Sequence, residues 1–277
     1  LKVYLKLLFL QFYSISTNSQ NIYIDFLVYL TRWLAKAPRL DSRYYFVKKI
    51  LFNNPFFYYF YKRIKIFRNS FKNHHLGEYG EDIFIRRFFK DLKSGTYVDV
   101  GCYHPIKGSL TYYLYINGWS GMNIDLSQAS IDLFKISRPK DINIRAAISN
   151  FDGETHYYEN GKINQQNSLI GNNENKIKIQ SYKLNTLLEK FKIHKIDFLN
   201  IDVEGHDFNV ISNFDFKKYK PKLITIEYNS YDFDKFLKSD IHNLLVKNQY
   251  FLTSKYGVTM LYVDLIFKDN IDKLLSV

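Results

Sequence analysis

The chain has 277 residues but contains only one cysteine, Cys102. A single thiol excludes a disulfide scaffold, a CxxC redox pair and a zinc site built from several cysteines. Proline and glycine are also scarce, with 5 and 12 residues, which excludes a collagen-like chain. Because 46% of the residues are hydrophobic, the chain can form one large domain, or a domain with a small appendage, rather than a disordered region.

Long hydrophobic runs are missing as well. A membrane-spanning helix needs about 20 consecutive apolar residues. The longest stretch without charge near the start, residues 7–24, contains eight polar side chains. No long apolar core with a small-residue cleavage site follows, so a secretory signal is not predicted either. We therefore expect a cytoplasmic protein, with peripheral contact at the inner membrane face as an open alternative.

Acidic residues are scarce in the first quarter of the chain. Residues 1–76 contain 13 Lys and Arg but only Asp25 and Asp41, whereas the rest of the chain contains 26 basic and 25 acidic residues. The shift predicts a basic, aromatic-rich helical extension over 1–75 and a second domain over 76–277. Within the extension, helices are expected near residues 2–13, 22–36, 41–52 and 55–67.

Three functions of this basic extension are compatible with its composition. It can form a helical cap on the second domain, or it can rest on anionic lipid headgroups. A basic segment with interleaved aromatics also suits RNA, but the chain has no aromatic RNP box and no GXXG loop. We expect the cap first and lipid contact second, and we expect no nucleic-acid partner.

The second domain alternates short β-rich runs with helical segments, which predicts an α/β fold with a mostly parallel sheet. The tight turn at Tyr256-Gly257 predicts an antiparallel hairpin at one edge. Strands are expected over residues 97–101, 122–125, 142–146, 153–159, 176–182, 196–202, 223–228, 249–254 and 258–265. Helices are expected over residues 106–118, 130–137, 184–192, 206–213 and 234–248.

Carboxylates follow several of these strands, at the end where open α/β sheets bind ligands. Asp125, 24 residues beyond Gly101, is placed to accept hydrogen bonds from two ribose hydroxyls. Gly101 would let the backbone approach the ligand closely. The loop after it lacks the GxGxxG pattern of pyrophosphate-binding turns, so a nucleoside without phosphates, such as S-adenosylmethionine, fits better.

Several segments together resemble the FkbM-type methyltransferases over roughly residues 76–230. They are Gly80-Glu81-Asp82, residues 97–105, 118–125 and 138–143, Ala147-Ile148-Ser149, residues 184–188, and residues 196–207 with the sequence IDFLNIDVEGHD. The resemblance implies a class I, Rossmann-like methyltransferase fold. It also implies an S-adenosylmethionine-dependent O-methyltransferase that acts on a sugar, a glycan or a secondary metabolite. The segment 103–105, Tyr-His-Pro, departs from the Asn and Gly of many members.

On this basis we predict the cofactor S-adenosylmethionine and a sugar, glycan or small-molecule acceptor. The predicted cofactor-binding residues are Glu81, Asp99, Gly101, Cys102, His104, Asp125, Ala147, Ile148 and Asp202.

The predicted catalytic residues are His206, Asp202 and Glu204. His206 is the first choice for the base that deprotonates the acceptor hydroxyl, and Asp202 is its orienter or rival. Equally, His206 can be a helix N-terminal residue without a catalytic role. Glu227 can reach the site or pair with a lysine. A divalent cation on Asp202 and Glu204 is the weaker alternative, so no metal site is predicted.

Two other functions stay open on the same fold. An NAD-dependent nucleotide-sugar enzyme would need the missing GxGxxG pattern. A non-catalytic module that docks on a membrane or a partner would not need Asp99, Gly101, Asp125 and Asp202, which are all present.

Overall fold

The computed structural model describes residues 77–159, 167–170 and 176–271. Contacts divide the chain into two units, Leu1–Lys65 and Ile66–Val277, and all described residues belong to the second unit. The predicted helices of the basic extension and the boundary after residue 75 lie outside the described residues.

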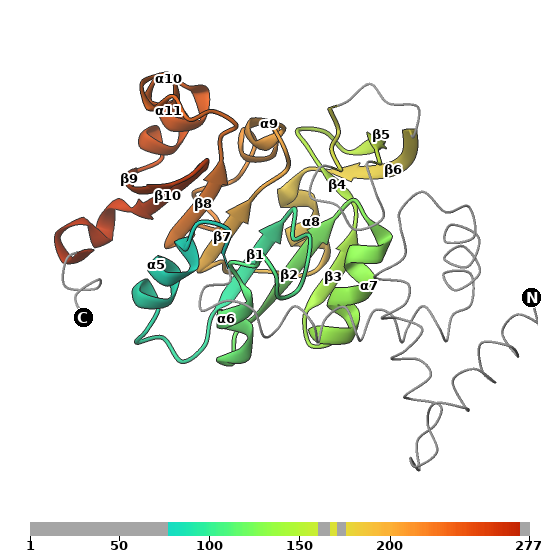
Figure 1. The fold of residues 1–277 in the computed structure, drawn as a ribbon, viewed down its shortest axis with the longest axis horizontal. Helices are drawn as coiled ribbons and strands as arrows, with labels where there is room; N and C mark the ends of the chain where they lie inside the picture. Colours follow the sequence, from blue (N-terminus) through green and yellow to red (C-terminus); the bar gives the residue numbers. More distant parts are fainter. Residues whose placement is uncertain (1–76, 160–166, 171–175, 272–277) are drawn as a thin grey trace, which may run out of the picture. The chain divides into compact units, whose positions relative to one another are not determined.

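The second unit contains a seven-stranded sheet in the order β3-β2-β1-β7-β8-β10-β9 (Figure 1). Its strands are β1 (Thr96–Val100), β2 (Ser120–Asp125), β3 (Ile142–Arg145), β7 (Phe198–Ile201), β8 (Leu223–Glu227), β9 (Tyr250–Tyr256) and β10 (Thr259–Asp264). Neighbouring strands are parallel from β3 to β8, whereas β10 is antiparallel to both β8 and β9. The predicted mostly parallel sheet with an antiparallel edge hairpin is confirmed.

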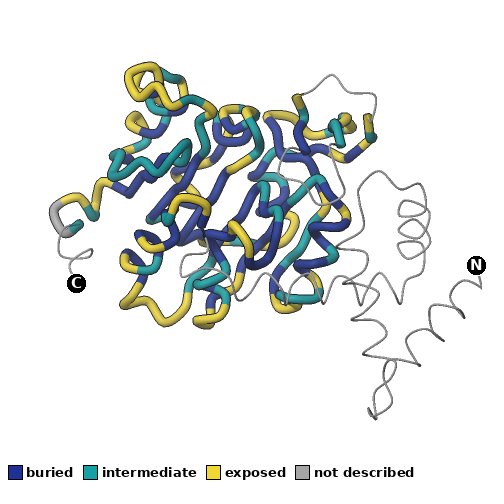
Figure 2. The backbone as a smooth tube through the Cα atoms, in the orientation of Figure 1, coloured by how far each residue is buried: buried dark blue, intermediate teal, exposed yellow. Residues whose placement is uncertain are grey.

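The central strands are buried along most of their length (Figure 2). Strands covered on both faces read as continuous apolar runs, and all four residues of β7 are buried. Asn200 on β7 and Thr225 on β8 are two of the polar side chains that interrupt these runs. They satisfy one another, because the Thr225 hydroxyl donates to Asn200 Oδ1 at 2.7 Å.

Helices cover both faces of the sheet. On one face, α8 (Leu184–Lys190), α9 (Asp207–Ile211), α10 (Phe233–Leu237) and α11 (Asp240–Lys247) contribute to the larger hydrophobic core. On the other face, α5 (Glu81–Phe88) and α6 (Tyr112–Ile116) form a second core with Trp119, and α7 (Gln128–Ser137) packs beside them. A 3₁₀ helix, η1 (Leu265–Asn270), follows the last strand.

Two predicted helices differ from the structure by more than their end residues, and α5 was not among the predicted helices. The helix expected from residue 106 begins only at Tyr112, because the preceding residues form a loop held by their own side chains. His104 Nδ1 accepts hydrogen bonds from Ile106 N and Lys107 N. The helix expected over 234–248 is divided into α10 and α11, since the hydroxyl of Ser239 caps a new helix by accepting from His242 N.

A second, three-stranded sheet lies in the segment where the sequence predicts extended structure without a defined pairing. It contains β4 (Ala147–Ile148), β5 (Gly153–Tyr158) and β6 (Lys176–Tyr182) in the order β4-β6-β5. The chain therefore leaves the main sheet after β3, and Ala147–Ile148 pair in the second sheet instead. Strand order in the main sheet reverses between β1 and β7, and at such a reversal the carboxyl ends of the strands leave a crevice.

Candidate active site

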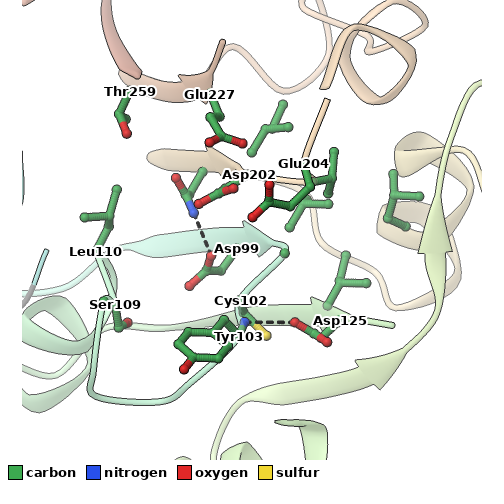
Figure 3. A pocket seen from close by; sticks show the side chains of 18 of the residues that line it. Asp99, Cys102, Tyr103, Ser109, Leu110, Asp125, Asp202, Glu204, Glu227 and Thr259 are labelled. Atoms are coloured by element: carbon green, nitrogen blue, oxygen red, sulfur yellow. Dashed lines mark hydrogen bonds between the residues drawn. The ribbon is translucent and has the colours of Figure 1, made fainter. Parts of the chain in front are cut away.

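A pocket opens at this reversal, beyond the carboxyl ends of β1, β2, β7 and β8 (Figure 3). Its volume is about 1090 Å³, including the part open to solvent. Of the residues predicted from the sequence, the lining includes Glu81, Asp99, Gly101, Cys102, Asp125, Ile148, Asp202 and Glu204. Their roles stay predictions, but the fold brings all eight to one cavity.

Gly101 is required at this position by a backbone contact rather than by a ligand. Its φ of +83° lies in the left-handed region that favours glycine. A Cβ placed on it would lie 1.7 Å from the carbonyl oxygen of Asp202. The glycine therefore allows the end of β1 to pass directly beside the end of β7, which brings the two halves of the pocket together.

Asp125 ends β2, and two backbone amides fix its carboxylate. Tyr103 N donates to Oδ2 at 2.8 Å, and Ser127 N donates to Oδ1 at 2.7 Å. Burial raises the pKa of Asp125 to about 6, while these two hydrogen bonds oppose the shift. Each oxygen keeps acceptor capacity toward the pocket, because a carboxylate has about four lone-pair sites.

Asp99 lies on β1 and is almost fully buried. Its carboxylate accepts from the Thr111 hydroxyl at 2.6 Å and from Asn200 Nδ2 at 2.9 Å. Burial raises its pKa, and both hydrogen bonds oppose that rise. Asp99 thus connects β1 to β7 and to the loop that precedes α6.

Arg138, at the end of α7, has no exposed surface and anchors the same loop from below. Its guanidinium donates to the Thr111 hydroxyl and to the Ser109 hydroxyl, both at 2.7 Å, and to the carbonyl oxygen of Pro105. Nε has no partner among the described residues. Burying a cation is costly unless its N–H groups are hydrogen-bonded. The acceptors of the loop offset part of this cost, and the guanidinium in turn holds the loop in place.

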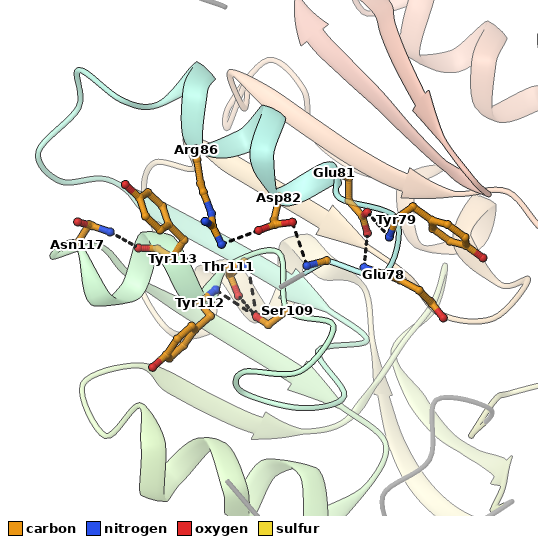
Figure 4. Close-up of polar contacts among 11 residues, drawn as sticks. Glu78, Tyr79, Glu81, Asp82, Arg86, Ser109, Thr111, Tyr112, Tyr113 and Asn117 are labelled. Atoms are coloured by element: carbon orange, nitrogen blue, oxygen red, sulfur yellow. Dashed lines mark hydrogen bonds and ion pairs between the residues drawn. The ribbon is translucent and has the colours of Figure 1, made fainter. Parts of the chain in front are cut away.

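The segment before α5 forms the wall of the pocket beside this loop (Figure 4). Glu81 accepts from Glu78 N at 3.2 Å and from Tyr79 N at 2.8 Å. Asp82 accepts from Gly77 N at 3.1 Å and forms an ion pair with Arg86 at 2.6 Å. These carboxylates of the first helical turn bind the backbone amides of the segment that precedes the helix, which fixes Glu78 and Tyr79 at the pocket.

Asp202, Glu204 and Glu227 face the pocket from its opposite side (Figure 3). Asp202 is exposed and lines the pocket, and desolvation by the surrounding protein, together with the Glu227 charge, raises its pKa well above the ordinary range. Burial raises the pKa of Glu227 to about 7, while its hydrogen bond to Asp202 opposes the shift. Both carboxyl groups therefore take up a proton more readily than an isolated, solvated carboxylate does.

Two side chains hold the loop that carries Glu204. Asp207 accepts from Val203 N and Gly205 N, each at 3.1 Å. Asn229, with its amide oriented to satisfy both neighbours, donates to Glu227 Oε1 at 2.9 Å and accepts from Gly205 N at 3.1 Å. Glu204 itself has a left-handed φ of +56°, so this turn is held in a conformation that non-glycine residues rarely adopt.

Three predicted residues lie outside the lining. The ring of His206 is half-buried, and Nε2 lies 2.9 Å from the hydroxyl of Ser149, away from the pocket. His104 is buried, and its ring shapes the loop through the two amide hydrogen bonds described above. Ala147 is buried against Tyr157 in the second sheet, and its neighbour Ala146 lines the pocket instead.

Cys102 lines the pocket but is not a reactive thiol. It packs against Ile131 and Phe134 of α7, and burial raises its pKa well above the ordinary value. A thiol that stays protonated is a weak nucleophile. Cys102 therefore fills space beside the pocket.

Several lining residues were not assigned to the site from the sequence, namely Glu78, Tyr103, Ser109, Asn200 and Thr259. Asn200 carries a detectable signal, since a polar residue within an apolar strand needs a buried partner. The sequence left two roles open for Glu227, in the site or in an ion pair with a lysine, and the structure places it in the pocket lining. Arg138 lies within a segment that carries the family resemblance, but nothing in its local sequence indicates complete burial.

The charge of the lining is unusual for this basic chain. Among the described residues that line the pocket, seven have carboxyl groups and none is lysine or arginine. A pyrophosphate group would find no cation there, which argues against NAD. A nucleoside with a positive charge, such as S-adenosylmethionine, is compatible with this lining.

No group of three or more metal-ligating side chains suited to hold an ion occurs among the described residues. Likewise, in the ranges that the structure covers, no helix combines the length and apolar character needed to cross a bilayer.

A comparison with protein families identifies the family of the domain that contains most of this pocket. The family described as the methyltransferase FkbM domain matches residues 99–252, more than half of the chain. The chain belongs to the FkbM methyltransferase family. The match includes the ends of β1, β2, β7 and β8, so most of the pocket of this FkbM-family methyltransferase lies within the shared domain. Five lining residues lie outside the match, namely Glu78, Tyr79, Glu81, Val258 and Thr259.

Similarity to individual proteins is low. A solved structure of a TehB-like SAM-dependent methyltransferase from Corynebacterium glutamicum ATCC 13032 Kitasato is 13% identical, with a TM-score of 0.40, and the alignment covers 76% of this chain and 100% of that one. No curated protein matches the chain. The family assignment therefore carries the functional argument, together with the pocket.

Proposed function

We propose that this FkbM-family methyltransferase transfers a methyl group from S-adenosylmethionine to a hydroxyl of a sugar, a glycan or a related small molecule. The observation that carries the proposal is one pocket with fixed carboxylates on the β1–β2 side and, on the β7–β8 side, the carboxyl groups of Asp202 and Glu227, whose pKa values are raised. The first side suits cofactor binding, and the second suits deprotonation of an alcohol.

The chain's residues fit the adenosine end of the cofactor at β2. The carboxylate of Asp125, fixed by Tyr103 N and Ser127 N, would accept hydrogen bonds from the two ribose hydroxyls. The apolar side chains of Ile124, Leu126 and Ile148 line the same part of the pocket and would contact the adenine ring.

The carboxyl pair Asp202–Glu227 would supply the base. S-adenosylmethionine, when bound, would supply an electrophilic methyl group for the acceptor oxygen and would leave as S-adenosylhomocysteine. Glu227 would accept the hydroxyl proton, since its pKa of about 7 keeps part of it ionised at neutral pH. Asp202, which lines the pocket with Glu227, would orient it. His206 is not proposed as the base, because its ring contacts Ser149 outside the pocket lining.

Isothermal titration tests the cofactor site. We expect S-adenosylmethionine and S-adenosylhomocysteine to bind, and Asp125→Ala to weaken both by about tenfold or more, since a hydrogen bond to a charged group contributes about 1.5–3 kcal/mol. NAD is the control ligand and should not bind. Absence of cofactor binding by the folded protein, or tight NAD binding, would contradict the proposal.

We also propose that residues 1–75 support reversible membrane contact, because each Lys or Arg near an anionic surface contributes about 1 kcal/mol. The excess of basic residues in this extension supports the proposal. Sedimentation with anionic and neutral vesicles, comparing the full chain with one that starts at Phe71, is the test. Equal, salt-independent sedimentation of both proteins would refute it, and loss of cofactor affinity in the shorter one would identify a cap instead.

A further inference from the structure

Three aromatic side chains remain exposed beside the mouth of the pocket. The exposed fractions are 44% for Tyr79, 72% for Tyr231 and 40% for Phe233. Tyr79 lines the pocket, and its hydroxyl lies 3.4 Å from that of Tyr231. Lys255 connects the group, because its ammonium donates to the Tyr231 carbonyl at 2.9 Å and lies 5.9 Å from the ring centre of Tyr231 and 5.7 Å from that of Phe233. We call these four residues the aromatic shelf.

The fold fixes the shelf at the chemical end of the pocket. Tyr79 rests on the β9–β10 turn, where a Cβ on Gly257 would lie 2.5 Å from its ring. The same hairpin brings Thr259 opposite Glu227 on β8, and both line the pocket. A ligand on the shelf can therefore extend to the carboxyl pair without passing the Asp125 side.

Exposed aromatic surface next to a pocket marks a binding surface more often than isolated exposed apolar residues do. The charged residues around this surface limit the classes of ligand that it can bind. A cation would be repelled by Lys255, whose ammonium already lies beside two of the rings. An anion would meet Glu78, Glu204 and Glu227 at the pocket. A wholly apolar ligand would bury these carboxylates without hydrogen bonds, which is costly.

A neutral sugar ring meets all three conditions. One face of a pyranose presents C–H groups that pack on an aromatic ring, and its hydroxyls donate hydrogen bonds to carboxylates. We propose that the aromatic shelf binds a neutral glycosyl unit of the acceptor and presents one of its hydroxyls to Asp202 and Glu227. This inference rests on the proposed function for the role of the presented hydroxyl, but the binding of the sugar does not require methyl transfer.

The test is binding of the labelled full chain to an array of neutral and acidic oligosaccharides with saturating S-adenosylhomocysteine. We expect binding to neutral glycans that falls about tenfold in Tyr231→Ala and in Phe233→Ala, in line with the loss of an aromatic contact. The matched control is Phe151→Ala, since Phe151 is 42% exposed but does not line the pocket. Its binding should equal that of the unchanged protein.

Titration of the same variants with S-adenosylhomocysteine separates the two proposals. Three outcomes would each refute the proposed role of the aromatic shelf without affecting the proposed cofactor site. They are cofactor binding without glycan binding, equal glycan binding by all variants, and binding restricted to acidic glycans. Glycan binding that depends on the shelf, with no affinity for the cofactor, would support the shelf and refute the methyltransferase proposal. If the unchanged protein binds neither glycan nor cofactor, both proposals are refuted.

Discussion

The two sides of the pocket hold their carboxyl groups in different ways. On the β1–β2 side, both oxygens of Asp99 and of Asp125 accept a hydrogen bond from an amide or a hydroxyl. On the β7–β8 side, no amide or hydroxyl of the described residues donates to Asp202 or Glu204. Glu227 accepts at Oε1 from Asn229, and its Oε2 has no partner among the described residues. Fixed carboxylates suit recognition of a constant cofactor, whereas groups with few donors can take up and release a proton.

The largest effect is expected where the two sides touch. Gly101→Ala should destabilise the protein by more than about 3 kcal/mol, since it combines left-handed strain with a backbone clash at Asp202. Gly108→Ala is the matched control, because Gly108 has a φ of +69° but no atom within 4 Å of a new Cβ. It should cost only about 1–2 kcal/mol. Urea unfolding measures both, and equal losses would show that the contact with Asp202 does not matter.

A smaller loss of stability is expected when Arg138, which holds the loop on the β1–β2 side, is replaced. Arg138→Met removes the donors to Ser109, Thr111 and Pro105, and should cost about 2–4 kcal/mol. The loop that positions Tyr103 N on Asp125 should then loosen, so cofactor affinity should fall as well. Arg87→Met, at an exposed position of α5, is the control and should change neither quantity. Unchanged stability of the Arg138 variant would contradict the anchoring role.

The titratable side should determine how the rate depends on pH. Because the base form of Glu227 is needed and its pKa is raised to about 7, the rate should increase as pH rises through 7 and then level off. Glu227→Gln should lower the rate by about 10²–10⁴-fold and remove this rise. His206→Gln should retain the profile. If His206→Gln abolishes the rise instead, the histidine is the base after all.

The smallest effect concerns stability at different pH values. The pKa of Asp202 is raised in the folded state, so its stabilising contribution is present at low pH and is lost as pH rises through the folded pKa. Asp202→Asn should therefore raise the melting temperature at pH 8, with no gain near pH 4. Asp125→Asn is the contrasting variant, because it puts an amide against a backbone donor and should lower the melting temperature at pH 8. The same response in both variants would remove the distinction between the two sides.

Much of the site could be predicted because strand ends are readable in the sequence. Apolar runs that end in Asp99, Asp125 and Asp202 place those residues at one edge of a parallel sheet, and all three line the pocket. The edge hairpin was equally readable from its turn. The loop after Gly101 was not, since a helix-compatible sequence gives no indication that His104 and Ser109 fold back on their own amides.

The sequence by itself determined the α/β class, the family and the carboxylates at the strand ends, because these depend on local patterns of apolar and acidic residues. Only the tertiary structure decided which of them act together. It turned His206 toward Ser149, buried Arg138 completely, and brought Glu227 beside Asp202 and Tyr79 beside Tyr231. These contacts join residues far apart in the chain, and their energies depend on burial and on distances of a few ångströms, which no local pattern encodes.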